Sequence, residues 1–362
     1  MTAFVESCVE TVAGSAHKLD RRTKGRLRAT RLLRMLATKK NVLVTAHIHP
    51  DPDALASALA LTYLLRAKLP QTPVALSFKG MVGGGMNETF AKLSNIDYVP
   101  WDDSKLGQYD AIILLDCQPA FAYSPLPEGV SPMGVIDHHR SRGRKPTCGF
   151  CDVRVDVGAT SSVIFSYFME LETPIPRDLG ATLLYAIESD LAGAAGAPGE
   201  LDNLALSSLT LIADPRLLYR MRYVNLPATY YGAFYRGLGH AHVYGDAVMS
   251  HLDQIDSLEQ PAVIADFLLR LEKINWCLVT AVFGGKLVLS LRTNSSKQTA
   301  ADVMTSLLRN LGEGGGHRTK AGGAIVLESG TQAEIERKRN ILRRRYLRIL
   351  GIRQAAGSKL VH

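Results

Sequence analysis

Short apolar runs that alternate with helix-forming stretches are the feature that most constrains the fold of this chain. Residues 41–46 (NVLVTA) are rich in β-branched side chains, and a strong helix-forming stretch follows at residues 54–68. The next apolar runs lie at residues 73–78, 111–116 and 133–137. Strands that alternate with helices predict an α/β domain with a mostly parallel sheet and helices on both of its faces. Ligands of such a sheet are expected beyond the carboxyl ends of its strands.

The pattern changes after about residue 215. Residues 216–260 mix aromatic residues with glycines, and we interpret them as a helical connector. Residues 276–283 and 286–291 predict a β-hairpin closed by Gly284 and Gly285. The remaining elements that we expect are a helix at 299–311, a glycine-rich loop at 312–316 and a strand at 323–328. This half of the chain therefore predicts a smaller C-terminal α/β domain, which we expect to face the first across a cleft.

The length of 362 residues favours two domains, because single cores rarely grow beyond about 250–300 residues. The organisation that we expect is a basic helical leader at 1–36, a first domain at 37–215, the connector at 216–260, a second domain at 261–330 and a basic tail at 331–362. Neither end carries an apolar run near the 18–20 residues or so that a membrane span needs, nor the layout of a secretory signal. We therefore expect a cytoplasmic protein without a membrane partner.

The net charge of +8 is unevenly distributed. Residues 1–40 and residues 331–362 each carry a net charge of +7, so the remaining middle of the chain carries −6. An acidic body suits a site that holds divalent cations, and basic ends attract polyanions. The alternative is that both ends are only solvated helices, and composition leaves the two interpretations open.

The five cysteines form an odd and scattered set, which argues against a disulfide framework. Cys148 and Cys151 make a C-x-x-C pair. A zinc or redox site would usually need a second such pair, so this motif by itself is a weak indication of either.

The strongest chemical signal follows the first apolar run. His47, Asp51 and Asp53 stand in H-x-x-x-D-x-D spacing between a strand and a helix, and Pro50 and Pro52 stiffen the loop. Two acids at i and i+2 face different ways, so one loop can serve two metal ions. The structural alternative is a helix N-cap supplied by Asp53.

Three further acidic positions close the elements that follow. Asp116 ends the run AIILLD, and Asp137, His138 and His139 follow the next short strand. Successive side chains of a strand point to opposite faces, so one histidine can bind a metal while its neighbour reaches the substrate. Asp190 lies at the end of a helix, where a carboxylate is unfavourable without a cation. Together these positions predict a metal site at one edge of the sheet.

These motifs, in this order, resemble the four motifs of DHH phosphoesterases. Residues 311–323 (LGEGGGHRTKAGG) are similar to the G-G-G-H signature of the C-terminal domain associated with that family, and residues 289–295 (LSLRTNS) resemble the strand before it. The resemblance covers roughly residues 35–330. It is closest to the oligoribonuclease branch, the nano-RNases that include phosphoadenosine phosphatases.

The resemblance implies a two-metal catalytic site. The implied ligands are His47, Asp51 and Asp116 for one ion, and Asp53, Asp116, His138 and Asp190 for the other. Asp116 would bridge the ions, and His139 would stay off them and contact the scissile phosphate. The implied contacts to the far phosphate or nucleotide are Arg292, Gly315, Gly316 and His317. Mixed carboxylate and imidazole ligands suit Mn²⁺, with Mg²⁺ or Co²⁺ as substitutes.

The function that the resemblance implies is a metal-dependent phosphodiesterase or exonuclease. Its substrates would be short oligoribonucleotides or linear dinucleotides cleaved to nucleoside monophosphates, with phosphoadenosine phosphatase activity in the same branch. One alternative is a polyphosphatase or pyrophosphatase, which uses the same metal motifs with a different C-terminal domain. Another is a non-catalytic nucleotide- or nucleic-acid-binding protein, against which the intact ligand set argues. Leu191 and Lys320 depart from the family pattern and leave substrate preference open, as the sequence leaves a homodimer open.

Overall fold

The computed structural model describes residues 27–80, 85–140, 148–191, 198–316, 318–353 and 356–361. These residues form two compact units. The first runs to Val224 and the second begins at Asn225, with Gly85 and Met86 also belonging to the second.

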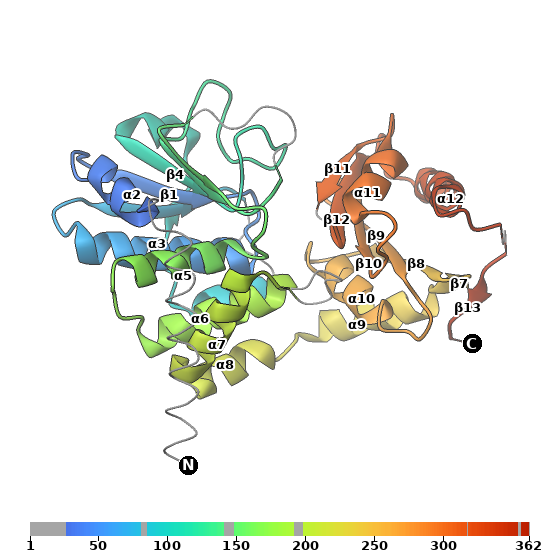
Figure 1. Cartoon of the computed structure of the whole chain (residues 1–362). Coiled ribbons are helices and arrows are strands. Elements are labelled where there is room, and N and C mark those ends of the chain that lie inside the picture. The colour runs from blue at the N-terminus through green and yellow to red at the C-terminus, as the bar shows by residue number, and fades with distance from the viewer. Residues whose placement is uncertain are drawn as a thin grey trace, which may run out of the picture. The chain divides into compact units, whose positions relative to one another are not determined.

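The first unit contains one sheet and the helices that pack on it (Figure 1). Its strands are β1 (Val42–Ala46), β2 (Val74–Phe78), β3 (Val99–Pro100), β4 (Ala111–Leu115), β5 (Gly134–Asp137) and β6 (Phe150–Val153). Its helices are α2 (Arg28–Leu36), α3 (Pro52–Lys68), α4 (Met86–Leu93), the 3-10 helix η1 (Asp103–Gln108), α5 (Thr160–Glu170), α6 (Arg177–Leu191), α7 (Glu200–Ile212) and α8 (Pro215–Arg222).

The sheet of the first unit is parallel throughout, in the order β3-β2-β1-β4-β5-β6. The chain first builds outward from β1 to β3 and then restarts at β4 on the other side of β1. The strand order therefore reverses between β1 and β4. Loops that leave two such strands run in opposite directions and open a crevice between them, which is where parallel α/β sheets bind their ligands.

Both faces of this sheet are buried, which explains why its strands are apolar at nearly every position. Alternate residues of β4 divide between two clusters: Ile113 and Leu115 pack with the helices, whereas Ile112 and Leu114 pack on the opposite side. Helix α3 packs against β1 and β2 and against α5 and α6, and most of its residues from Pro52 to Leu65 are buried. The opposite face is covered by η1 and by side chains of the segment between β4 and β5.

The first described part of the basic leader is integrated into the first unit. Helix α2 buries Ala29, Leu32 and Leu36 and packs on α5. The Glu170 carboxylate of α5 accepts hydrogen bonds from the backbone amides of Ala29 and Thr30 at 3.0 and 2.8 Å. These bonds satisfy amide groups that the first turn of a helix leaves unpaired. The rest of the leader, residues 1–26, lies outside the described residues.

The second unit is built on a seven-stranded mixed sheet in the order β11-β12-β10-β9-β8-β7-β13. Its strands are β7 (His242–Tyr244), β8 (Ala247–Gln254), β9 (Trp276–Phe283), β10 (Lys286–Thr293), β11 (Glu313–Gly316), β12 (Lys320–Val326) and β13 (Ser358–Lys359). Its helices are α9 (Ala228–Gly239), α10 (Gln260–Leu268), α11 (Ala300–Leu308) and α12 (Gln332–Ile349). Helices α11 and α12 pack on one face with Leu289 and Leu291, and α10 packs on the other with Cys277 and Val279.

The predicted hairpin is confirmed, and its turn explains the two glycines. Strands β9 and β10 pair antiparallel, and Gly284 and Gly285 between them both have positive φ, 53° and 73°. A two-residue turn with positive φ at both positions matches the twist of a hairpin and suits glycine. The fold class expected from the sequence, a parallel-sheet α/β domain with a second α/β unit, is also confirmed.

Three expectations for the second half differ from the structure. Residues 216–260 are not only helical, because β7 and β8 lie within them and join the second sheet. The glycine-rich segment expected as a loop forms the edge strand β11, whose backbone pairs with β12. The basic tail contains α12, which buries Ile335, Leu342 and Tyr346 in the second core. This helix has six arginines among its 18 residues, and they hid the spacing of its apolar side chains in the sequence.

Candidate metal centre

The acidic and histidine motifs meet at the point where the strand order of the first sheet reverses. His47, Asp51 and Asp53 follow β1, and Asp116 follows the neighbouring strand β4. The His138–His139 pair comes directly after β5, which is next to β4. Parallel strands end at the same edge, so elements distant in sequence deliver their side chains to one place.

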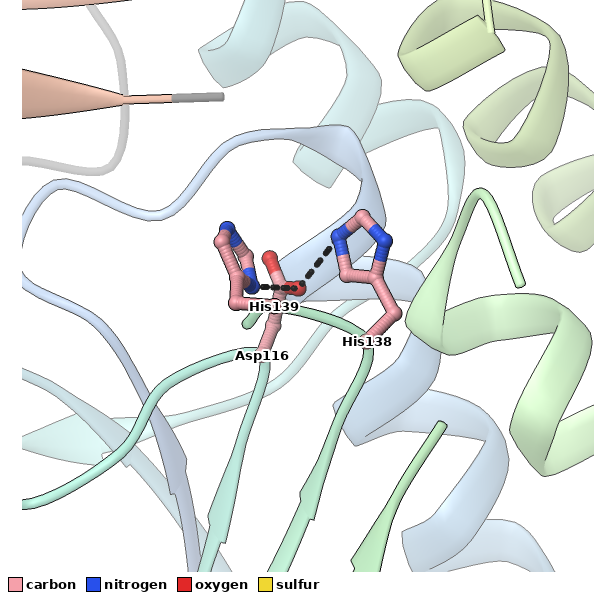
Figure 2. Close-up of side chains that lie close together, drawn as sticks. All are labelled: Asp116, His138 and His139. Carbon is pink, nitrogen blue, oxygen red and sulfur yellow. Dashed lines mark ion pairs between the residues drawn. The ribbon is translucent and has the colours of Figure 1, made fainter. Parts of the chain in front are cut away.

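Asp116 lies at the centre of this group. Its Oδ2 is 3.6 Å from Nε2 of His47, and its Oδ1 is 3.4 Å from Nε2 of His138. Figure 2 shows the carboxylate of Asp116 between the imidazoles of His138 and His139. Its backbone has a φ of +52°, which asparagine and aspartate tolerate better than most residues. The hydroxyl of Thr160 donates a hydrogen bond of 2.8 Å to Oδ1 and fixes the carboxylate further.

Three overlapping groups of side chains have potential ligand atoms within 4.8 Å of one another. The groups are His47 with Asp51 and Asp116, Asp53 with His138 and Asp190, and Asp116 with His138 and His139. All six residues predicted as metal ligands therefore lie together. Asp116 contacts His47 of the first group and His138 of the second. Within the described parts of the chain, no group of this kind includes a cysteine, and Cys148 and Cys151 form no disulfide there.

The two aspartates of the H-x-x-x-D-x-D loop have different structural roles. Asp51, not Asp53, is the N-cap of α3, since its Oδ1 accepts a 3.1 Å hydrogen bond from the amide of Ala54. Asp53 instead accepts bonds of 2.7 and 2.8 Å from the backbone amides of Thr160 and Ser161 at the start of α5. The helix N-terminus favours a negative charge there and holds the carboxylate in position.

The electrostatics of the metal-free group favour cations. Burial and the nearby carboxylates of Asp116 and Asp190 raise the pKa of Asp53 well above its usual range. Burial by itself would lower the pKa of His47, but the carboxylates of Asp51 and Asp116 raise it to about 9. Crowded carboxylates that repel one another are stabilised by divalent ions, and the mixed carboxylate and imidazole donors fit such ions.

His139 is held by a network that the sequence reasoning missed. Its Nδ1 lies 2.6 Å from Oδ1 of Asp137, and the other oxygen of Asp137 accepts a 2.6 Å hydrogen bond from the side-chain amide of Gln118. The same amide group donates to the backbone carbonyl of His139 at 3.0 Å. Gln118, Thr160 and Ser161 had no motif of their own in the sequence. Their only signal was position, because Gln118 stands two residues after Asp116 and Thr160 begins a helix.

The residues predicted to contact the remote end of a substrate lie in the second unit. Arg292 is on β10, where it pairs in register with Lys320 of β12, and Gly315 and Gly316 are on β11. Nε of Arg292 donates a 2.7 Å hydrogen bond to Asp266, which orients the guanidinium group. His317 lies outside the described residues. A side chain added at Gly322, two residues after Lys320 on the same strand, would meet only a backbone oxygen 3.8 Å away, so the sheet is open at that point.

Among the segments that the structure describes, no helix combines the length and the apolar character needed to cross a bilayer.

Sequence comparisons give the following relatives. Residues 41–187 match the DHH family, N-terminal domain. An uncharacterized protein of Methanocaldococcus jannaschii is 27% identical over 339 residues, which cover 91% of this chain and 69% of that protein. A probable manganese-dependent inorganic pyrophosphatase of Lactobacillus gasseri is 29% identical over 151 residues, 41% of this chain and 47% of the pyrophosphatase. The match thus spans about half the length of that pyrophosphatase.

Comparison with solved structures supports the same architecture. An exopolyphosphatase-related protein from Bacteroides fragilis matches with a TM-score of 0.68 at 16% identity, over 90% of this chain and 98% of that chain. RecJ from Thermus thermophilus in complex with Mn²⁺ matches with a TM-score of 0.51 at 16% identity, over 90% of this chain and 55% of RecJ. At these identities the likeness extends to the fold.

Proposed function

Because residues 41–187 are the N-terminal domain of a DHH family protein, we propose that this chain is a metal-dependent phosphodiesterase. Its proposed substrates are short oligoribonucleotides or linear dinucleotides, which it hydrolyses to nucleoside monophosphates. Removal of the extra phosphate from a phosphoadenosine is a related reaction that the same site would support.

The observation that carries the proposal is the position of Asp116. One oxygen faces His47 and the other faces His138, and each histidine belongs to a separate group of potential ligands. A single carboxylate shared by two ligand groups is the arrangement that two-metal hydrolases use. We assign His47, Asp51 and Asp116 to one ion and Asp53, Asp116, His138 and Asp190 to the other.

Manganese is the metal that we propose, with magnesium or cobalt as substitutes. Oxygen and imidazole nitrogen donors suit Mn²⁺. The similar pyrophosphatase is named manganese-dependent, and the RecJ structure with the same fold contains Mn²⁺. Divalent ions in such a site supply a Lewis acid for phosphoryl oxygens and lower the pKa of water.

The side chain proposed to act on the substrate is His139. Its Nδ1 is engaged with Asp137, which leaves Nε2 to face the scissile phosphate and to hold a proton against the developing negative charge. A carboxylate on the far nitrogen fixes the orientation and tautomer of an imidazole. His139 therefore contributes without being a metal ligand.

The proposed binding residues of the second unit favour a nucleotide as the substrate over a smaller phosphate compound. We propose that Arg292, Gly315, Gly316 and His317 bind the phosphate or nucleotide remote from the scissile bond. Arg292 is restrained by Asp266 and by a 3.0 Å hydrogen bond to the hydroxyl of Ser290, so little side-chain entropy is lost on binding. Gly322 of β12 leaves the backbone accessible to a ligand, because a side chain added there would meet only a backbone oxygen 3.8 Å away.

A pyrophosphatase or polyphosphatase is the second candidate. It is favoured by the similarity to manganese-dependent inorganic pyrophosphatases and by the fold shared with an exopolyphosphatase-related protein. The identity to the pyrophosphatase covers only 41% of this chain. A non-catalytic binding protein is disfavoured because every proposed metal ligand is present.

A turnover panel separates these functions. Dinucleotides, oligoribonucleotides up to about 24 nucleotides, phosphoadenosine, pyrophosphate and polyphosphate would each be incubated with the Mn²⁺-loaded protein. The highest kcat/KM is expected for two to about five nucleotides, since remote binding contributes only when a substrate has a second nucleotide. Faster hydrolysis of pyrophosphate or polyphosphate would favour the pyrophosphatase or polyphosphatase function. If none of these compounds is hydrolysed, both proposed functions are refuted.

A further inference from the structure

A surface hollow in the second unit is lined by three arginines and by none of the residues assigned so far. Its volume is about 260 Å³, slightly below the roughly 300–1,000 Å³ of pockets for drug-sized ligands. It is lined by Ser306, Arg309, Asn310, Arg345, Arg348 and Ile349. These residues come from the end of α11, the turn after it, and the last two turns of α12.

The packing of α11 on α12 explains why these side chains converge. Leu307 and Leu308 of α11 and Leu342 and Tyr346 of α12 are buried in the same core. The residues beside them on each helix therefore border a groove at the surface. Nη1 of Arg345 donates hydrogen bonds to the carbonyls of Leu307 and Arg309, at 3.0 and 2.7 Å, and so caps the end of α11.

The charge of the hollow is not balanced by protein groups. No acidic residue lines it, and within the described residues none of its three arginines forms an ion pair. Other arginines do have such partners: Arg292 pairs with Asp266, and Arg222 with Glu188. Guanidinium groups that converge without a carboxylate repel one another, and a phosphate that accepts two N–H groups from one of them relieves this repulsion.

The positive charge continues along α12. From Arg337 to the end of the helix the sequence contains seven basic residues and no acid. Arg337, Arg344 and Arg348 are all exposed and are separated by seven and four residues, which places them on one stripe of the helix. At 1.5 Å per residue the stripe is about 16 Å long. A mononucleotide cannot contact both of its ends, whereas a strand with several phosphates can.

We propose that the arginine hollow and the stripe on α12 bind the phosphodiester backbone of a single-stranded oligonucleotide. This site goes beyond the proposed hydrolysis, because binding there requires neither the metal centre nor Arg292. It captures strands by their phosphates and therefore has no base preference.

The test is binding of a fluorescent RNA strand of about 24 nucleotides to the full-length protein, with EDTA present to prevent hydrolysis. The double variant Arg309→Gln with Arg348→Gln is expected to bind about 25-fold more weakly at about 0.1 M salt. The slope of log K against log salt should become shallower by about 1.4, because two phosphate contacts are lost. Arg345 is left unchanged in this variant, because it caps α11.

The matched control is Arg270→Gln with Lys273→Gln. Both residues are exposed and follow α10, which packs on the opposite face of the second sheet, so this variant removes the same charge elsewhere. It should retain affinity within about twofold. Equal losses in the two double variants would mean that only net charge matters, and unchanged binding by Arg309→Gln with Arg348→Gln would also overturn the assignment.

Competition separates the sources of phosphate. Unlabelled RNA is expected to displace the probe far better than inorganic phosphate or adenosine monophosphate at equal phosphate concentration. Stronger displacement by either small anion, or by polyphosphate, would overturn the assignment to an oligonucleotide.

Turnover of a dinucleotide with Mn²⁺ is measured in parallel and should be unchanged in both double variants. A wild-type protein that binds RNA but cleaves no nucleotide would refute the proposed hydrolysis and leave this site standing.

Discussion

Oδ1 of Asp137 lies 2.6 Å from Nδ1 of His139, and both side chains are buried beside the candidate metal ligands. The carboxylate also accepts hydrogen bonds from the backbone amide of His138 at 2.9 Å and from the side-chain amide of Gln118 at 2.6 Å. Both oxygens of Asp137 therefore accept hydrogen bonds. It is suited to orient a neighbouring imidazole, and its place at the end of β5 makes that orientation rigid.

Replacing Asp137 with Asn should therefore lower kcat while KM for a dinucleotide and the bound metal stay near normal. Loss of an outer hydrogen-bond partner of this type typically costs about 10–100-fold. The measurements are steady-state kinetics, which separate kcat from KM, and metal content. Loss of bound metal in this variant would show that Asp137 supports the ligands and not His139.

Asp116→Asn should remove nearly all turnover and reduce bound metal, since the bridging position needs a carboxylate that offers an anionic oxygen to each ion, whereas an amide offers one neutral oxygen. Because Asp116 sits at the end of a strand whose apolar side chains are unchanged, circular dichroism should show a folded protein. An Asp116→Asn protein with normal turnover and metal content would refute the bridging assignment.

His139→Ala is the matched comparison to the Asp116 variant. It should retain both metal ions and lose rate, because Nδ1 of His139 is already engaged with Asp137. Metal content by elemental analysis and single-turnover kinetics measure the two effects separately. If His139→Ala loses metal and His138→Ala does not, the roles of the two histidines must be exchanged.

Metal binding should release protons. The pKa of His47 is raised to about 9 in the metal-free protein, so this imidazole is protonated at neutral pH. Only neutral imidazole binds a metal, so the ion must displace that proton and apparent affinity should rise with pH until about pH 9. Calorimetric titration with Mn²⁺ in two buffers of different ionisation enthalpy measures the release. Identical heats in both buffers would contradict this prediction.

Arg292→Ala should raise KM for a dinucleotide by at least about tenfold, since one charged hydrogen bond to a phosphate contributes about 1.5–3 kcal/mol. A small artificial phosphodiester with no second nucleotide should be cleaved at the wild-type rate. Arg270→Ala, a change at an exposed arginine of the same unit, is the control. Equal losses on both substrates would remove Arg292 from the substrate-binding assignment.

Much of the first unit follows from local sequence. Strands β1, β2, β4 and β5 lie within the predicted apolar runs to within a residue or two. Runs of this kind are recognisable because both faces of a parallel sheet are buried, so every position must be apolar. The edge strands β3 and β6 were not predicted, because they are short and partly exposed and carry no such pattern.

The second unit was harder to predict, because its elements depend on neighbours distant in sequence. Strand β11 consists of Glu313 and three glycines, which have no preference for extended structure. It forms because its backbone pairs with β12. Helix α12 is dominated by basic residues, yet Leu342 and Tyr346 are fully buried, and only packing on α11 reveals this.

The sequence by itself determined the identities of the candidate ligands and the strand or helix end at which each stands. Spacing in a loop, as in His47–Asp51–Asp53, is a local property and can be read directly. The tertiary structure decided that Asp116 lies between His47 and His138, and that Gln118 donates both to the carboxylate of Asp137 and to the backbone carbonyl of His139. These relationships join different elements, and they arise because the sheet places β4 between β1 and β5. Strand order is set by the burial of whole elements against one another, which no short stretch of sequence encodes.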